Sequence, residues 1–190
     1  MKVYNIHDNK NFRLKRNRKS KKTSSTSQLP LFQTPVLRLS GRTFFEEALR
    51  LDELGDPSAR EYYLKAIEEK ENIADSYSNL GIIEAAHDRM KAFGYFLKSI
   101  QFNPSHCEAH FNIANLYFEE KDFHLAKLHY EIAKEIDPVF PNIYFNLALV
   151  NIELNEIGKA EQNLKLYIDL VGVEEGSDAE EILFHIKNMR

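Results

Sequence analysis

The sequence predicts an all-α protein, an α-solenoid of antiparallel helical hairpins, and two observations carry this prediction. Alanine recurs at Ala59, Ala92, Ala126 and Ala160, at intervals of 33, 34 and 34 residues. Aromatic and small residues recur at intervals of 33 or 34 residues at four more phases of the repeat. Those phases hold Tyr63, Phe96, Tyr130 and Leu164; Ala66, Ser99, Ala133 and Tyr167; Phe44, Tyr77, His110 and Tyr144; and Ala48, Gly81, Ala114 and Ala148. Such a period, with small and aromatic residues at fixed phases, indicates stacked helical hairpins.

The hairpins follow one another along the chain. Apolar residues recur at helical spacing from Arg42, and Gly55-Asp56-Pro57 ends that helix before a second helix over 58–70. The same pair is expected at 73–86 with 89–102, at 107–120 with 123–136, and at 141–154 with 157–170. The hairpin turns are expected at His87-Asp88, Lys121-Asp122 and Asn155-Glu156. Breaks between repeats fall at Asn103-Pro104, Asp137-Pro138 and Gly172, since proline cannot continue a helix.

The chain divides into a tail, an array and a final helix. Residues 1–40 lack helical periodicity and form a basic tail that we expect to be disordered alone. Four repeats follow over 41–172, at about 41–72, 73–106, 107–140 and 141–174. Ser177-Asp178-Ala179-Glu180 is typical of a capping box. It opens a helix of about 178–189, so that residues 177–190 cap the array.

Charge is distributed unevenly along the chain. The net charge of −4 combines a tail of +9 over residues 1–39 with −13 over residues 40–190. The two parts therefore have different partners, or each other as partners.

The repeats resemble tetratricopeptide repeats over about residues 42–172. The third repeat is the clearest, with His110-Phe111-Asn112-Ile113-Ala114, Tyr117, Asp122-Phe123, Ala126, Tyr130, Ala133 and Asp137-Pro138. The resemblance implies a right-handed superhelix with a concave groove lined by the first helix of each hairpin, and extended peptides as ligands. Carried over to this sequence, the groove residues are Phe45, Leu49, Ser78, Asn79, Ile82, Phe111, Asn112, Asn115, Phe145, Asn146 and Leu149.

Two kinds of groove residue have an alternative role in packing. Asn79, Asn112 and Asn146 share one phase, and an amide offers both donors and an acceptor to a peptide backbone. The alternative is that this Asn fixes helix packing. Phe111 and Phe145 are either apolar anchors for a ligand or packing residues between helices.

The groove is expected to favour basic or apolar peptides. Members of this family that clamp a C-terminal carboxylate use Lys and Arg in the groove. The matching positions hold no cation, and therefore no charge-assisted bond to a carboxylate. They are Asp75, Ser78, Glu108, Phe111, Asn142 and Phe145.

Catalytic, metal and cofactor sites are not expected. His106 and His110 lie four residues apart, with Cys107 between them and His129 on the next helix. Because His110 holds the phase of Tyr77 and Tyr144, it is expected to be a packing residue rather than a zinc ligand. No phosphate loop or Ser/His/Asp spacing occurs, so we expect no enzyme. With no signal-peptide core and no apolar run of about 20 residues, a cytoplasmic location is expected.

The tail holds two candidate interaction segments. The first is a basic run suited to phosphates or an acidic protein surface, with a solvated tail as the alternative. It comprises Arg13, Lys15, Arg16, Arg18, Lys19, Lys21 and Lys22. The second resembles the pentapeptide by which bacterial partners dock on the DNA-polymerase sliding clamp. It comprises Gln28, Leu29, Pro30, Leu31 and Phe32. The alternative, which we favour, is that its apolar residues fold back on the first hairpin.

We therefore predict a non-catalytic scaffold or adaptor that binds a peptide or helix of a partner protein in its groove. The alternative function is a DNA-associated adaptor whose tail engages nucleic acid or a sliding clamp. Self-association, either through the ends of the array or by insertion of the basic tail into the acidic groove, is a third possibility.

Overall fold

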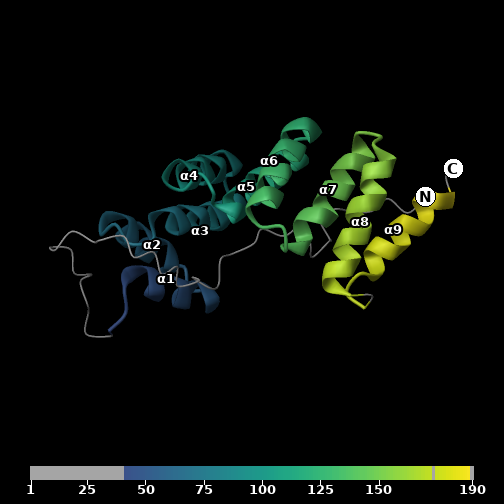
Figure 1. Ribbon diagram of the computed structural model, residues 1–190. Helices are drawn as coiled ribbons and strands as arrows, with labels where there is room; N and C mark the ends of the chain where they lie inside the picture. Colours follow the sequence, from purple (N-terminus) through teal and green to yellow (C-terminus); the bar gives the residue numbers. More distant parts are fainter. Residues whose placement is uncertain (1–40, 173, 189–190) are drawn as a thin grey trace. The chain divides into compact units, whose positions relative to one another are not determined.

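The computed structural model describes residues 41–172 and 174–188, and within these ranges it contains helices and no strand. The helices are α1 (Phe44–Glu53), α2 (Ala59–Glu68), α3 (Ile73–Ala85), α4 (Arg89–Phe102), α5 (Cys107–Glu119), α6 (Phe123–Ile136), α7 (Pro141–Glu153), α8 (Ile157–Val171) and α9 (Ser177–Asn188). They pair as the hairpins α1–α2, α3–α4, α5–α6 and α7–α8, and α9 packs against α8 (Figure 1). The all-α hairpin prediction is confirmed, and the helices begin and end within about two residues of the expected positions.

The described residues form two compact units. Residues 41–104 hold α1–α4, and residues 105–172 with 174–188 hold α5–α9. The first unit has a core in which Phe45, Tyr63 and Leu80 are buried. The second has a larger core, which includes Phe111, Tyr130, Phe145 and Tyr167 and extends to the apolar face of α9.

Small residues allow the two helices of a hairpin to approach each other. Ala48, Ala114 and Ala148 are fully buried at one repeat phase, and Gly81 holds that phase in the second hairpin. A Cβ atom added to Gly81 would lie 2.5 Å from the ring of Phe96. The second hairpin therefore requires glycine where the others accept alanine, because the ring of Phe96 lies in the space that a Cβ atom would fill.

Three of the four hairpin turns use the left-handed backbone region. Gly55, Lys121 and Asn155 have φ angles of 70°, 61° and 57°. The second hairpin, which is one residue shorter, has no such residue at its turn, and Ala86 ends α3 in the right-handed region instead. Asp88 then caps α4 by accepting a hydrogen bond from the Lys91 N–H at 3.0 Å.

The start of the last helix differs slightly from the prediction. Ser177 is the first helical residue of α9 rather than the residue before it, and the carbonyl of Gly176 accepts the Glu180 N–H at 3.0 Å. A reciprocal capping box occurs instead at Thr43 and Glu46 of α1, where each side chain bonds the other residue's backbone N–H.

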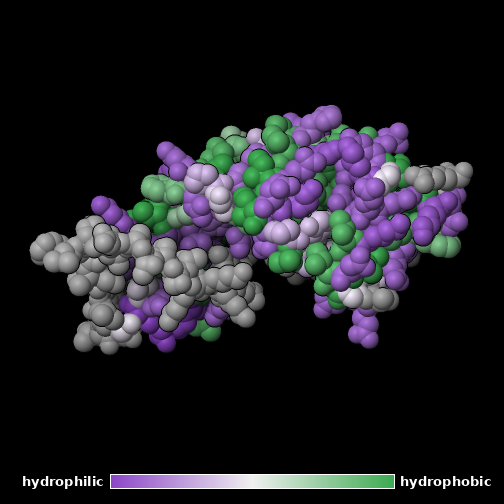
Figure 2. Space-filling model, in the orientation of Figure 1, coloured by the Kyte–Doolittle hydropathy of each residue, from purple (hydrophilic) through white to green (hydrophobic). Residues whose placement is uncertain are grey.

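Hydrophilic and apolar side chains are interspersed over the visible face of the described residues (Figure 2). None of the helices in residues 41–172 and 174–188 has the length and hydropathy needed to cross a membrane.

Candidate functional site

Three side chains form a buried polar network in the unit of α5–α9. The Tyr130 hydroxyl donates to Asn115 Oδ1, and Asn146 Nδ2 donates to both Asn115 Oδ1 and Tyr130 Oη at 3.1 Å. The three residues come from α6, α5 and α7, so the network ties one hairpin to the next. Because Tyr130 is fully buried, the cost of taking its phenolate from water raises its pKa well above the usual value, and it remains a neutral hydrogen-bond donor.

The network leaves one donor and one acceptor without a partner. Asn115 Nδ2 and Asn146 Oδ1 are both buried and make no hydrogen bond with the protein. Since Asn146 donates to Asn115, the two amides lie side by side. Together they offer an N–H and a C=O, which is the complement of one peptide group.

Further unpaired amide atoms lie on α3 and α7. In the unit of α1–α4, both Nδ2 and Oδ1 of Asn79 are buried without a hydrogen-bond partner. Asn151 Oδ1 on α7 is in the same condition. A buried amide atom without a partner costs about 1–3 kcal/mol, and native proteins leave few of them. These positions are therefore the ones at which a polar group from outside the described residues is most needed.

The structure favours the packing role for the predicted aromatic anchors. Phe111 is fully buried, with its ring centroid 5.6 Å from Tyr130 and 5.0 Å from Phe140. Phe145 is fully buried edge-on to Tyr167 at 5.1 Å. In this conformation the rings fill space between helices and offer no exposed face to a ligand.

The other predicted groove residues are also mostly buried. Asn112 is fully buried, whereas Leu49 is half-buried beside the core of the first unit. Phe45, Ile82 and Leu149 retain 4%, 8% and 8% of their exposure. On these helices the amide side chains, rather than the apolar ones, therefore have atoms that can still form a hydrogen bond.

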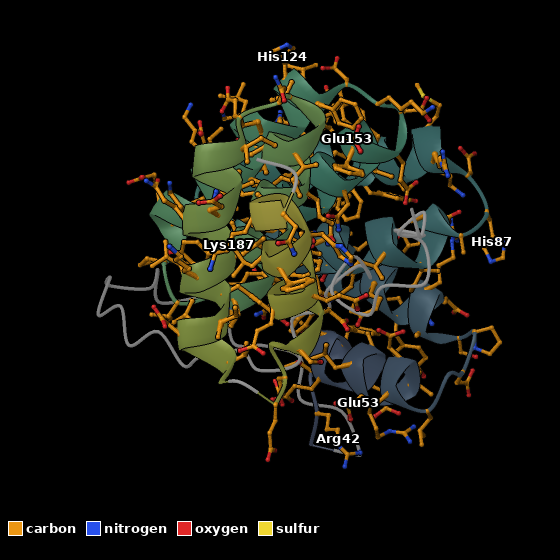
Figure 3. The ribbon with its side chains drawn as sticks, turned by 90° about the vertical axis from the view of Figure 1, so that its right-hand side faces the viewer. Arg42, Glu53, His87, His124, Glu153 and Lys187 are labelled. Atoms are coloured by element: carbon orange, nitrogen blue, oxygen red, sulfur yellow. The ribbon has the colours of Figure 1, made fainter. Side chains whose placement is uncertain are left out.

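The histidines take structural positions. The His106 side chain caps α5, because its Nδ1 accepts the Ala109 N–H at 3.1 Å. The ring of His110 packs on His129, with Nδ1 atoms 3.1 Å apart. His124, by contrast, is exposed and projects outward from the start of α6 (Figure 3). Among the described residues no group of three or more His, Cys, Asp or Glu side chains is arranged to hold a metal ion.

Burial shifts the pKa values of His129 and Cys107. Desolvation, with a smaller contribution from His110, lowers the pKa of His129 to about 4, so that this imidazole is neutral at pH 7. Burial raises the pKa of the Cys107 thiol to about 12. The thiol lies 3.5 Å from the Ala133 carbonyl and is protonated at neutral pH, so it is not a reactive nucleophile.

Some acidic side chains near the hairpin contacts are engaged by cations. Glu84 Oε1 lies 2.8 Å from both Arg60 Nε and Lys91 Nζ. Hydrogen bonds from Lys127 and Lys159 lower the pKa of Glu156 to about 2. Glu108, which holds one of the positions where the family clamps a carboxylate, is half-buried. Glu153, at the end of α7, is exposed (Figure 3).

Sequence reasoning missed two residues of the site. The sequence indicates Tyr130 only as one member of a repeat phase that holds Phe96 and Leu164 in other repeats. Its hydroxyl instead organises Asn115 and Asn146. Asn151 does not belong to any of the repeat phases. Its position directly after the apolar run Leu147-Ala148-Leu149-Val150 could nevertheless have indicated a buried polar side chain. The predicted interaction segments of the tail lie outside the described residues.

Comparisons with known proteins support the fold. Residues 108–140, which span α5 and α6, match the family model of the tetratricopeptide repeat. A crystal structure of MamA protein is similar with a TM-score of 0.62 and 18% identity, over 77% of this chain and 82% of that one. The structure of MamA 41-end from Desulfovibrio magneticus RS-1 has a TM-score of 0.59 and 16% identity, over 77% of this chain and 94% of that one.

The first TPR of Spaghetti (RPAP3), bound to the HSP90 peptide SRMEEVD, gives a TM-score of 0.56 and 17% identity, over 61% of this chain and 91% of that one. Identities this low show the fold alone. No curated protein sequence matches the chain. The tetratricopeptide resemblance of the sequence is confirmed, as four helical hairpins followed by a final helix in the described residues.

Proposed function

We propose that this chain of tetratricopeptide repeats is a non-catalytic scaffold that holds an extended peptide segment of a partner protein along the first helices of the hairpins within one unit. One observation carries the proposal. Buried amide atoms lack hydrogen-bond partners on α3 of the first unit and on α5 and α7 of the second, and the tetratricopeptide resemblance assigns these helices to ligand binding. An extended peptide supplies C=O and N–H groups at regular spacing, so it can satisfy the neighbouring atoms of α5 and α7 in succession.

The partner segment is expected to be basic or apolar. The unit from residue 105 to the end of the chain has seven Lys or Arg and sixteen Asp or Glu. The peptide bound to the RPAP3 repeat ends in acidic residues. The positions at which the family clamps a carboxylate hold Glu108 and Asn142 here, so a ligand of that class is disfavoured.

The experiment separates binding from folding. Twelve-residue peptides are selected from a random library on the full chain, and their affinities are measured by fluorescence anisotropy. An affinity near 1 µM, or about −8 kcal/mol, is typical for a flexible ligand. Asn79→Ala and Asn146→Ala are compared with Lys165→Ala, which alters an exposed residue of α8.

Asn79→Ala is the sharper of the two variants, because it removes two buried polar atoms that make no hydrogen bond. The free energy recovered from these atoms offsets the cavity that the shorter side chain leaves, so we expect stability within about 1 kcal/mol of the wild type. We expect at least one selected class of peptide to lose about tenfold in affinity with Asn79→Ala or Asn146→Ala, and none with Lys165→Ala. Peptides that bind all three folded variants equally would refute the proposal.

A further inference from the structure

Helix α7 is buried around its whole circumference. Its residues from Asn142 to Asn151 are all buried, ten in succession. At 3.6 residues per turn this run covers nearly three turns, so residues on every side of the helix are buried. Helix α8 buries only Ala160, Leu164 and Tyr167, the single stripe expected of a helix at the surface.

The described neighbours of α7 leave two of its buried polar atoms without a hydrogen-bond partner. Among residues 41–172 and 174–188, α7 packs extensively against α6 and α8 only. The unpaired amide atoms Asn146 Oδ1 and Asn151 Oδ1 lie on this helix, and Asn115 Nδ2 lies beside them on α5. The occupant of this surface must therefore bring polar backbone groups to it as well as apolar contact.

We infer that residues 1–22 of the same chain occupy this surface, along α5 and α7, in competition with a partner peptide. The inference rests on the proposed function, because it assigns the tail to the same site. Residues 1–22 contain nine Lys or Arg and one Asp, which gives +8, whereas residues 105–190 carry −9. The tail segment thus has the basic character that we expect of a ligand.

The segment also has the required side chains and reach. The segment carries the apolar or aromatic residues Val3, Tyr4, Ile6, Phe12 and Leu14 among polar ones, with Tyr4 and Ile6, and Phe12 and Leu14, two residues apart. An extended chain can therefore present apolar groups to the helices and charges to the acidic side chains of this unit. Residues 23–40 link this segment to residue 41, and fully extended they would span about 60 Å. That is about three times the length of a 13-residue helix such as α7, which is about 20 Å.

Occupation by the chain's own tail makes the scaffold self-inhibited. A tethered segment acts at a high effective concentration, so even weak binding lowers the apparent affinity for an external peptide. Because the attraction is partly electrostatic, it weakens as the ionic strength rises from about 0.15 M to about 1 M, which shortens the Debye length from about 8 Å to about 3 Å.

The test uses the full chain and hydrogen exchange monitored by mass spectrometry. A charge-reversed variant (R16E, R18E, K19E and K21E) is compared with a charge-conserving control (R16K, R18K, K19R and K21R). We expect amides of α5 and α7 to exchange about tenfold faster in the first variant and unchanged in the control. E153K should also accelerate exchange of the α5 and α7 amides. E131K, at an exposed position of α6, should leave their exchange unchanged.

The outcomes distinguish the occupants of the site. Unchanged exchange of α5 and α7 in the charge-reversed variant overturns the inference, and so does protection that disappears on dilution from 100 to 1 µM, which assigns the site to a second copy. A selected peptide should bind the charge-reversed variant about tenfold more tightly than the wild type. If no peptide binds any variant but the exchange result holds, the proposed function fails and the tail contact stands.

Discussion

At Gly81 a single hydrogen atom decides whether α3 and α4 can pack. An added Cβ would approach the Phe96 ring to 2.5 Å, whereas at Gly94, within α4, it would meet no atom within 4 Å. We expect Gly81→Ala to destabilise the chain by about 1–3 kcal/mol, because overpacking exceeds the gain in helix propensity. Gly94→Ala should stabilise it by about 0.5–1 kcal/mol. Urea denaturation measures both, and a stabilising Gly81→Ala would contradict the packing shown.

The Tyr130 hydroxyl contributes to stability through the buried network. Tyr130→Phe removes a donor to Asn115 and an acceptor from Asn146 while it keeps the ring. We expect a loss of about 1–2 kcal/mol in the free energy of unfolding. Tyr63 holds the same repeat phase, and its hydroxyl lies 3.4 Å from Asp52 at a part-buried site. Tyr63→Phe should therefore cost less, and equal losses for the two variants would argue against a special role for the network.

At the scale of the element, the turn at Lys121 carries backbone strain. A φ of 61° in a residue with a Cβ costs about 1 kcal/mol, which glycine avoids. Lys121→Gly should raise the unfolding free energy by about 0.5–1 kcal/mol. Asn155→Gly, at the equivalent turn, should gain only a few tenths, because Asn tolerates this region. Thermal denaturation provides the measurement, and a lower melting temperature for Lys121→Gly would show that its side chain matters more than its backbone.

The contact between α5 and α6 is expected to weaken in acid through His129. Its pKa is about 4 when folded, against 6.5 for a free imidazole. Between these values the unfolded chain binds a proton that the folded chain does not, so stability is constant above pH 6.5 and falls as the pH drops towards 4. After allowance for its partial exposure, we expect a loss of about 1 kcal/mol at pH 5.

The histidine variants isolate this contribution. His129→Phe, which retains a ring to stack on Tyr117, should reduce the difference in unfolding free energy between pH 7.5 and pH 5. His124→Phe, at an exposed position, should leave the difference unchanged. The assignment fails if both substitutions have the same effect.

The repeat phase predicted the helices and their packing contacts, and it left open which residues contact a ligand. Ala48, Ala114 and Ala148 were expected to be small because two helices meet there, and all three are fully buried. Phase alone could not decide whether Phe111 faces a groove or a neighbouring helix, because both sides of a first helix are apolar. The pairing of Asn115 with Asn146 depends on the position of Tyr130 on a third helix, which no local pattern contains.

At the scale of the whole molecule, the chain consists of two units with unequal cores. The cluster of buried residues around Tyr63 has seven members, all in residues 41–104, whereas the cluster around Tyr130 has twenty-one, all in residues 105–188 and four of them from α9. In repeat proteins each hairpin contacts only its neighbours, so stability is a sum of local terms. Unequal cores should therefore produce unequal local stability along one chain.

Hydrogen exchange along the chain tests this inequality. Amides of α1 and α2 should exchange about a hundredfold faster than those of α7, because opening the smaller core exposes less apolar surface. Leu164→Ala, which creates a cavity in the larger core and costs about 2–5 kcal/mol, should accelerate exchange throughout α5–α9. It should leave α1 and α2 nearly unchanged, because their side chains contribute to the separate core around Tyr63. If Leu164→Ala accelerates exchange equally in all helices, the described residues unfold as one cooperative body.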